Sequence, residues 1–150
     1  MTHAERAKNN FLNGYNCAQS VVLAFADEID VPEKILLAAV MPLGGGLGRL
    51  RETCGAVSGG AVALGLLFPE CPKAEMYAMV QELAHACAAK NGTINCGQLL
   101  RGAGLPAETV PHPEERTQEY YRKRPCPELI FDAAGIVADI CRRRGRILSC

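Results

Sequence analysis

Four of the eight cysteines in this 150-residue chain lie where helices are expected to begin. The free N–H groups and the dipole at a helix start favour negative charge, so a thiol placed there is favoured as the thiolate. Thiolate is both the nucleophilic and the metal-binding form of cysteine. If these helix ends converge in the fold, the pattern predicts one thiol-based site, made of Cys17, Cys54, Cys96 and Cys126.

The spacing of these cysteines narrows the chemistry. Successive members are 37, 42 and 30 residues apart, and no C-x-x-C motif occurs, so neither a zinc ribbon nor a thioredoxin-type pair is indicated. Four dispersed thiolates suit an iron–sulfur cluster or a structural zinc ion, which would make the chain an interaction module. A reversible dithiol/disulfide is the third form of such a site, and it needs no cofactor.

A structural role for the cysteines is the alternative, because free cysteine is among the most buried residue types. Cys87 and Cys141 lie on apolar helix stripes and are assigned to the core, whereas Cys150 is terminal. Cys71 precedes a proline, as Cys126 does, so its exclusion from the site is open. A helical domain in which all cysteines are core residues therefore remains a competing hypothesis.

A glycine-rich segment, GGGLG, and two arginines precede Cys54. Arg49 and Arg51 would lower the pKa of the Cys54 thiol or hold an anionic substrate, or else serve as ordinary solvated charges. The glycine segment fits no phosphate-loop motif, and we expect a mobile loop that gates the site. Gly55 and Gly59, one helical turn apart, indicate the close approach of a cofactor or, as the favoured alternative, of another helix.

The elements that must position these residues are helices. Capping patterns and apolar stripes of helical period predict helices that begin near Thr2, Asn16, Pro32, Thr53, Pro72, Asn95 and Pro127, and a weaker one over 114–122. No stretch alternates with period two. We therefore expect an all-α fold, with residues 1–150 forming a single compact domain of about six to eight helices.

Composition excludes several functional classes. Sixteen basic residues balance sixteen acidic ones, and the chain has no tryptophan, so nucleic-acid binding is not expected. No apolar run reaches the roughly 20 residues that cross a bilayer, so no membrane insertion is expected. The polar N-terminus lacks a secretory signal, which predicts a cytoplasmic protein whose many cysteines serve metal or redox chemistry. The glycine- and alanine-rich helix faces leave a homodimer open.

Four stretches together resemble a known family. They are GYNCAQSV (14–21), CGAVSGG (54–60), CGQLL (96–100) and CPELI (126–130), in the expected order. The chain resembles the C_GCAxxG_C_C family of redox-active proteins. The resemblance implies a small helical bacterial or archaeal protein with a redox role, in which these four stretches supply the shared cysteines Cys17, Cys54, Cys96 and Cys126. Together with the helix-start placement, it favours electron transfer or redox chemistry at these cysteines. Neither the substrate nor the redox partner follows from it.

Overall fold

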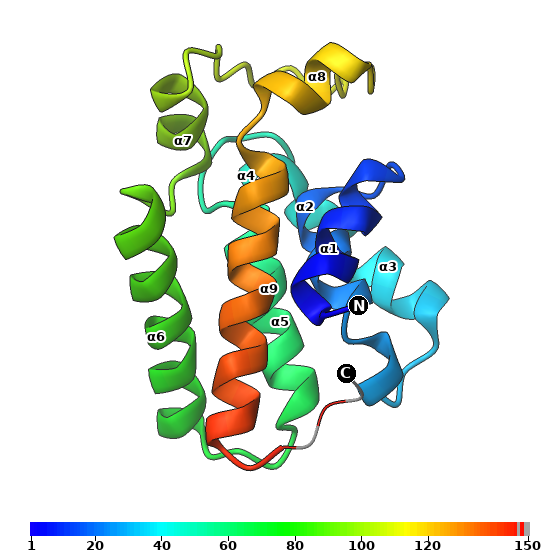
Figure 1. The fold of residues 1–150 in the computed structure, drawn as a ribbon, viewed down its shortest axis with the longest axis vertical. Coiled ribbons are helices and arrows are strands. Elements are labelled where there is room, and N and C mark those ends of the chain that lie inside the picture. The colour runs from blue at the N-terminus through cyan, green and yellow to red at the C-terminus, as the bar shows by residue number, and fades with distance from the viewer. Residues whose placement is uncertain (147, 149–150) are drawn as a thin grey trace.

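The computed structural model describes residues 1–146 and 148, and it confirms the all-α prediction (Figure 1). Within those residues the only extended pairing is an isolated bridge between Thr53 and Asn95. The helices are α1 (His3–Leu12), α2 (Cys17–Leu23), α3 (Glu33–Val40), α4 (Gly44–Leu47), α5 (Gly55–Leu67), α6 (Lys73–Asn91), α7 (Cys96–Gly102), α8 (Gln118–Lys123) and α9 (Cys126–Arg143), with 3₁₀ turns at Ala26–Glu28 and Met41–Leu43.

Helix α9 is the centre of the fold and packs against α1, α5 and α6 (Figure 1). Its apolar stripe is fully buried, as the helical period of the sequence predicted: Ile130, Ala133, Ala134, Val137, Ile140 and Cys141. Burial of apolar surface of this kind is the main favourable term in folding. α9 is thereby fixed in a rigid frame, and its first residue, Cys126, is fixed with it.

Helices α2 and α5 cross at very short range because α5 carries glycines at the contact. A Cβ atom on Gly59 would lie 2.7 Å from the carbonyl oxygen of Ala18, and one on Gly55 would lie 3.0 Å from Cβ of Cys17. Gly59 therefore allows α2 and α5 to pack closely. Because α2 fills the space beside Gly59, no room remains there for a cofactor, which was the other interpretation of this glycine. Gly55 lies closer to the start of α5, beside Cys17.

Side-chain capping accounts for where several helices begin. Thr2 and Asn16 form the predicted capping boxes, and the Asn95 side chain accepts a hydrogen bond from the N–H of Gln98. The prediction that Thr53 caps the central helix is wrong. α5 begins at Gly55 with Cys54 at the N-cap position, because the backbone around Thr53 pairs with the chain before α7.

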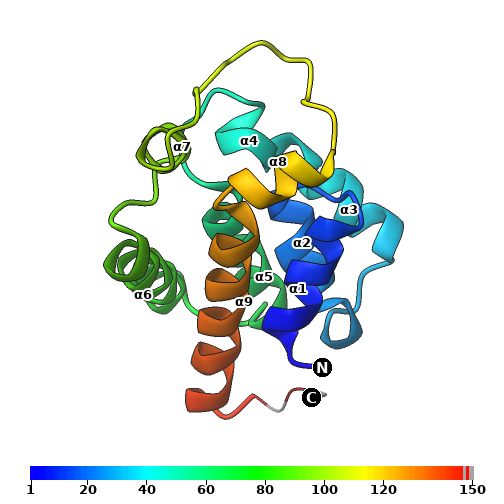
Figure 2. The same ribbon diagram turned by 45° about the horizontal axis from the view of Figure 1, so that its top comes forward.

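Several helix starts lie at one end of the molecule. Figure 2 shows α4, α7 and α8 grouped at the end where α5 and α9 begin. Among the described residues, no helix combines the length and the apolar character needed to cross a membrane.

Candidate functional site

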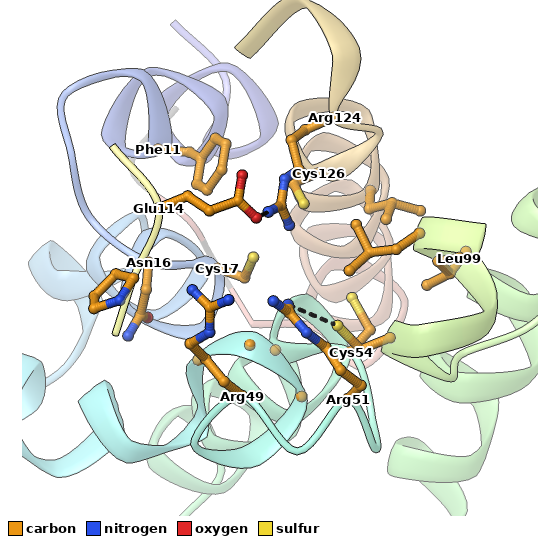
Figure 3. Close-up of a pocket in the computed structure, with 18 of the residues that line it drawn as sticks. Phe11, Asn16, Cys17, Arg49, Arg51, Cys54, Leu99, Glu114, Arg124 and Cys126 are labelled. Carbon is orange, nitrogen blue, oxygen red and sulfur yellow. Dashed lines mark hydrogen bonds and ion pairs between the residues drawn. The ribbon is translucent and has the colours of Figure 1, made fainter. Parts of the chain in front are cut away.

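The four cysteines singled out from the sequence line a single cavity of about 430 Å³ (Figure 3). Cys17, Cys96 and Cys126 are the first residues of α2, α7 and α9, and Cys54 is the N-cap of α5. Cys54 is buried and the other three are half-buried. Residues far apart in the sequence are thus gathered by the convergence of four helix starts.

Backbone hydrogen bonds hold two of these helix starts together. The N–H of Cys54 donates to the carbonyl of Ile94 at 2.7 Å, and the N–H of Cys96 donates to the carbonyl of Glu52 at 2.6 Å. A third bond joins Gly97 N to the Arg51 carbonyl at 3.1 Å. Because these bonds involve the main chain, they fix the relative position of Cys54 and Cys96 whatever their side chains do.

The glycine-rich segment is folded into a tight left-handed turn beside the cysteines. Gly45, Gly46 and Gly48 have φ values of 66°, 69° and 55°, and Arg49 and Arg51 also have positive φ, 67° and 62°. Hydrogen bonds from Arg51 N to Gly45 O (3.2 Å) and from Glu52 N to Gly46 O (2.8 Å) hold the turn. Left-handed backbone is costly for arginine, and such strain clusters at functional sites. The turn directs both arginine side chains into the cavity (Figure 3).

A proline-rich segment, residues 103–117, closes over the cavity and is held by arginines. Arg51 Nε donates to the carbonyl of Glu108 at 2.8 Å. Arg116 donates to the carbonyls of Phe11 (3.1 Å) and Tyr15 (3.2 Å), and its guanidinium lies 4.4 Å from the centre of the Phe11 ring. These contacts tie the segment to α1 and to the glycine-rich turn.

The electrostatics single out Cys126 among the cysteines. Hydrogen bonding with Cys17, together with the charge and hydrogen bond of Arg124, lowers the pKa of Cys126 to about 7, against the opposing effect of burial. The pKa of Cys17 is raised well above its ordinary value by the same hydrogen bond, by burial and by the neighbouring thiols. The pair therefore gains one negative charge as the pH rises through about 7, located on Cys126 and stabilised by the proton on Cys17.

The expectation that a helix start favours the thiolate at all four cysteines is wrong for Cys17 and Cys54. Burial raises the pKa of Cys54 to about 12, and the N–H groups of Ala56 and Val57 offset it only in part. Arg51 does not activate Cys54 either, because its Nη1 points to the sulfur of Cys96 at 3.7 Å. Desolvation outweighs the helix-end effect when a thiol is buried.

Replacing Arg124 by glutamine is expected to raise the pKa of Cys126 by on the order of one unit, because a neighbouring positive charge is lost. Alkylation of the Cys126 peptide by iodoacetamide, followed by mass spectrometry across pH 5–10, measures the midpoint. In the unmodified chain the rate should rise through a midpoint near 7. Arg122→Gln, at an exposed position of α8, is the control and should leave the midpoint unchanged. An unchanged midpoint in Arg124→Gln would contradict the assignment.

Three charged residues of the cavity were missed from the sequence: Glu114, Arg116 and Arg124. Arg124 lies half-buried over the Tyr120 ring, 4.6 Å from its centre, and pairs with Glu114. The sequence contained a pattern that could have identified Arg124, because Arg124 precedes Cys126 by two residues, much as Arg51 precedes Cys54 by three. Glu114 and Arg116 belong to the proline-rich segment, and no local pattern marks them.

The remaining cysteines lie outside the cavity. Cys87 and Cys141 are buried in the core as predicted, and burial raises the pKa of each to about 11. Cys71, whose membership of the site was open, does not line the cavity, and its sulfur lies 3.7 Å from a Glu75 carboxylate oxygen. Cys150 falls outside the described residues.

The cavity contains the donor atoms that a metal site needs, but the side chains that carry them are not arranged closely enough to hold a metal ion. Four cysteine sulfurs match the ligand sets of iron–sulfur clusters and of structural zinc. Across residues 1–146 and 148, however, no three Cys, His, Asp or Glu side chains are arranged so that they could hold a metal ion. Ligation would therefore require the cysteine side chains to move together.

Comparison with known proteins gives one match. The model of the family described as "Putative redox-active protein (C_GCAxxG_C_C)" matches residues 15–140, a range that includes all four cysteines of the cavity. No curated protein and no solved structure matches the chain significantly.

Proposed function

This chain belongs to the C_GCAxxG_C_C family, and we propose that it is a thiol–disulfide redox protein in which Cys126 and Cys17 cycle between a dithiol and a disulfide. The observation that carries the proposal is the asymmetry of the pair: the pKa of Cys126 is lowered to about 7 while that of Cys17 is raised. An attacking thiol works best when its pKa is near the ambient pH. Cys126 is therefore suited to attack the substrate disulfide, and Cys17 to attack the mixed disulfide in the second step.

The proposed reaction reduces a disulfide by two electrons. The Cys126 thiolate attacks one sulfur of the substrate, forming a mixed disulfide and expelling one substrate thiolate. Cys17 then loses its proton and attacks the sulfur of Cys126, which forms the Cys17–Cys126 disulfide and expels the second thiolate. The protein dithiol is oxidised and the substrate gains its two electrons. The two substrate thiolates become thiols by taking up the proton that Cys17 loses and one proton from water.

The surroundings of the pair support both steps. Arg124 and Arg116 each lower the pKa of Cys126, so the thiolate is held ready before substrate arrives. Cys126 is the first residue of α9, where free N–H groups favour its thiolate, and its hydrogen bond with Cys17 places the second thiol beside the mixed disulfide that forms on Cys126. We further propose that a reducing compartment such as the cytoplasm returns the protein to the dithiol form.

The test is to locate the disulfide. Reduced protein is treated with one equivalent of bis(2-hydroxyethyl) disulfide, remaining thiols are alkylated, and peptides are mapped without reduction. The expected product is a single cross-link between the peptides of Cys17 and Cys126. A dominant link between other cysteines, or no intramolecular link, would refute this function.

A thiolate-ligated iron–sulfur centre used in electron transfer is the second candidate, because four cysteines line a cavity that also holds four arginines. Cys17, Cys54, Cys96 and Cys126 would hold the cluster, whose chemistry is one-electron transfer, and the arginines would offset its negative charge. Anaerobic purification followed by iron, sulfide and zinc analysis tests it. One zinc ion per chain with no redox transition would instead identify the structural zinc module.

A further inference from the structure

The cavity that holds the cysteines is strongly cationic. Arg49, Arg51, Arg116 and Arg124 line it, and Glu114 is the acidic side chain found on its wall among the described residues. Three of the arginines already have partners: Arg51 bonds to a backbone carbonyl, Arg116 bonds to two, and Arg124 pairs with Glu114. These three hold the walls of the cavity together.

Arg49 differs from the other three. Its Nε and Nη2 atoms are buried and have no hydrogen-bond partner among the described residues. Burial and the nearby charge of Arg51 lower the pKa of its guanidinium, so the charge is poorly compensated where it lies. Nε and Nη2 form one edge of the guanidinium, and two parallel N–H groups on such an edge match the two oxygens of a carboxylate.

The backbone places Arg49 there at a cost. Its φ of 67° is one that glycine adopts far more readily than arginine does. Gly45 makes room for the side chain, because a Cβ atom on Gly45 would lie 2.7 Å from Cγ of Arg49. Figure 3 shows the guanidinium pointing into the cavity, next to Arg51 and on the side of Cys17. An unsatisfied cation held in this way is suited to an anion that enters the cavity.

We propose that Arg49 binds a carboxylate of the substrate, and that the substrate is a small disulfide that carries carboxylate groups. This inference rests on the proposed function, since it names the molecule that Cys126 attacks. The volume of about 430 Å³ is within the range of small-molecule pockets and suits a compact ligand. Reduction of this substrate yields two carboxylate-bearing thiols. The positive charge of the cavity attracts the negatively charged substrate and so offsets the repulsion between its carboxylates and the Cys126 thiolate.

The first arm of the test compares three disulfides of similar size: 3,3′-dithiodipropionate (anionic), bis(2-hydroxyethyl) disulfide (neutral) and cystamine (cationic). At fixed ionic strength the anionic compound is expected to react fastest with the reduced protein. In Arg49→Gln, the ratio of the anionic to the neutral rate should fall roughly tenfold, as expected for the loss of hydrogen bonds to a charged group. Arg143→Gln, at the far end of α9, should keep the ratio.

The second arm separates binding from redox chemistry. Suberate has the shape of 3,3′-dithiodipropionate with a CH₂–CH₂ unit in place of the disulfide, and calorimetry measures its binding. It should bind the unmodified protein and bind Arg49→Gln at least several-fold more weakly. Equal rates for all three disulfides, with no suberate binding, would overturn the carboxylate site and leave the redox function standing. Suberate binding through Arg49 without reduction of any disulfide would keep the anion site and refute the redox function.

Discussion

Replacing Cys126 by serine is expected to abolish the rapid reaction of the reduced protein with a neutral disulfide such as 4,4′-dithiodipyridine at pH 7. With a pKa of about 7, about half of Cys126 is thiolate at that pH, against about 1% for a thiol of pKa 9. A less basic thiolate is a weaker nucleophile, so the net advantage over an ordinary thiol is roughly fivefold. Serine has no thiolate. Cys17 is not expected to take over the attack, because burial and the neighbouring Cys54 and Cys96 still raise its pKa when Cys126 is absent.

The amount of 4-thiopyridone released separates the roles of the two cysteines. The unmodified protein should release two equivalents in the rapid phase, because Cys17 completes the reaction. Cys17→Ser should release one equivalent, more slowly, and remain as a mixed disulfide on Cys126. Cys126→Ser should release none in that phase. Cys87→Ser, at a buried core position outside the cavity, is the control and should behave like the unmodified protein. Survival of the rapid phase in Cys126→Ser would assign the attack to another residue.

The second large effect concerns stability at the crossing of α2 and α5. Gly59→Ala is expected to destabilise the protein by roughly 1–3 kcal/mol, because overpacking forces a well-packed interface apart. The added methyl group would meet the rigid backbone of Ala18 at 2.7–3.1 Å, and no flexible side chain is available to move aside. Displacement of α2 would also move Cys17, so disulfide exchange should slow together with the loss of stability.

Gly65 supplies a matched control within the same helix. A Cβ atom there meets nothing within 4 Å, so Gly65→Ala should stabilise the protein by up to about 1 kcal/mol through helix propensity. Urea denaturation of both variants gives the free energies of unfolding, provided that the two m-values agree. If Gly59→Ala stabilised the protein as Gly65→Ala is expected to, the close contact at Gly59 would be disproved.

Local features of the sequence accounted for most of the helices. Thr2 and Asn16 cap through hydrogen bonds to residues three positions away, and the stripe of α9 has the period of the helix itself. The prediction failed at Thr53, where capping potential was overridden by backbone pairing with the chain before α7. That pairing joins segments far apart in the sequence, so no local rule contains it.

The features of the candidate site also divide into those set by local sequence and those set by the tertiary structure. The sequence by itself determined which cysteines begin helices, because capping and helical period act over a few residues. The tertiary structure alone decided that these cysteines share a cavity and that one of them ionises near neutral pH. Ionisation depends on burial, on the hydrogen bond between Cys17 and Cys126, and on Arg116 and Arg124. Such electrostatic effects depend on distances in space and on exclusion of water, and neither is fixed until the helices pack.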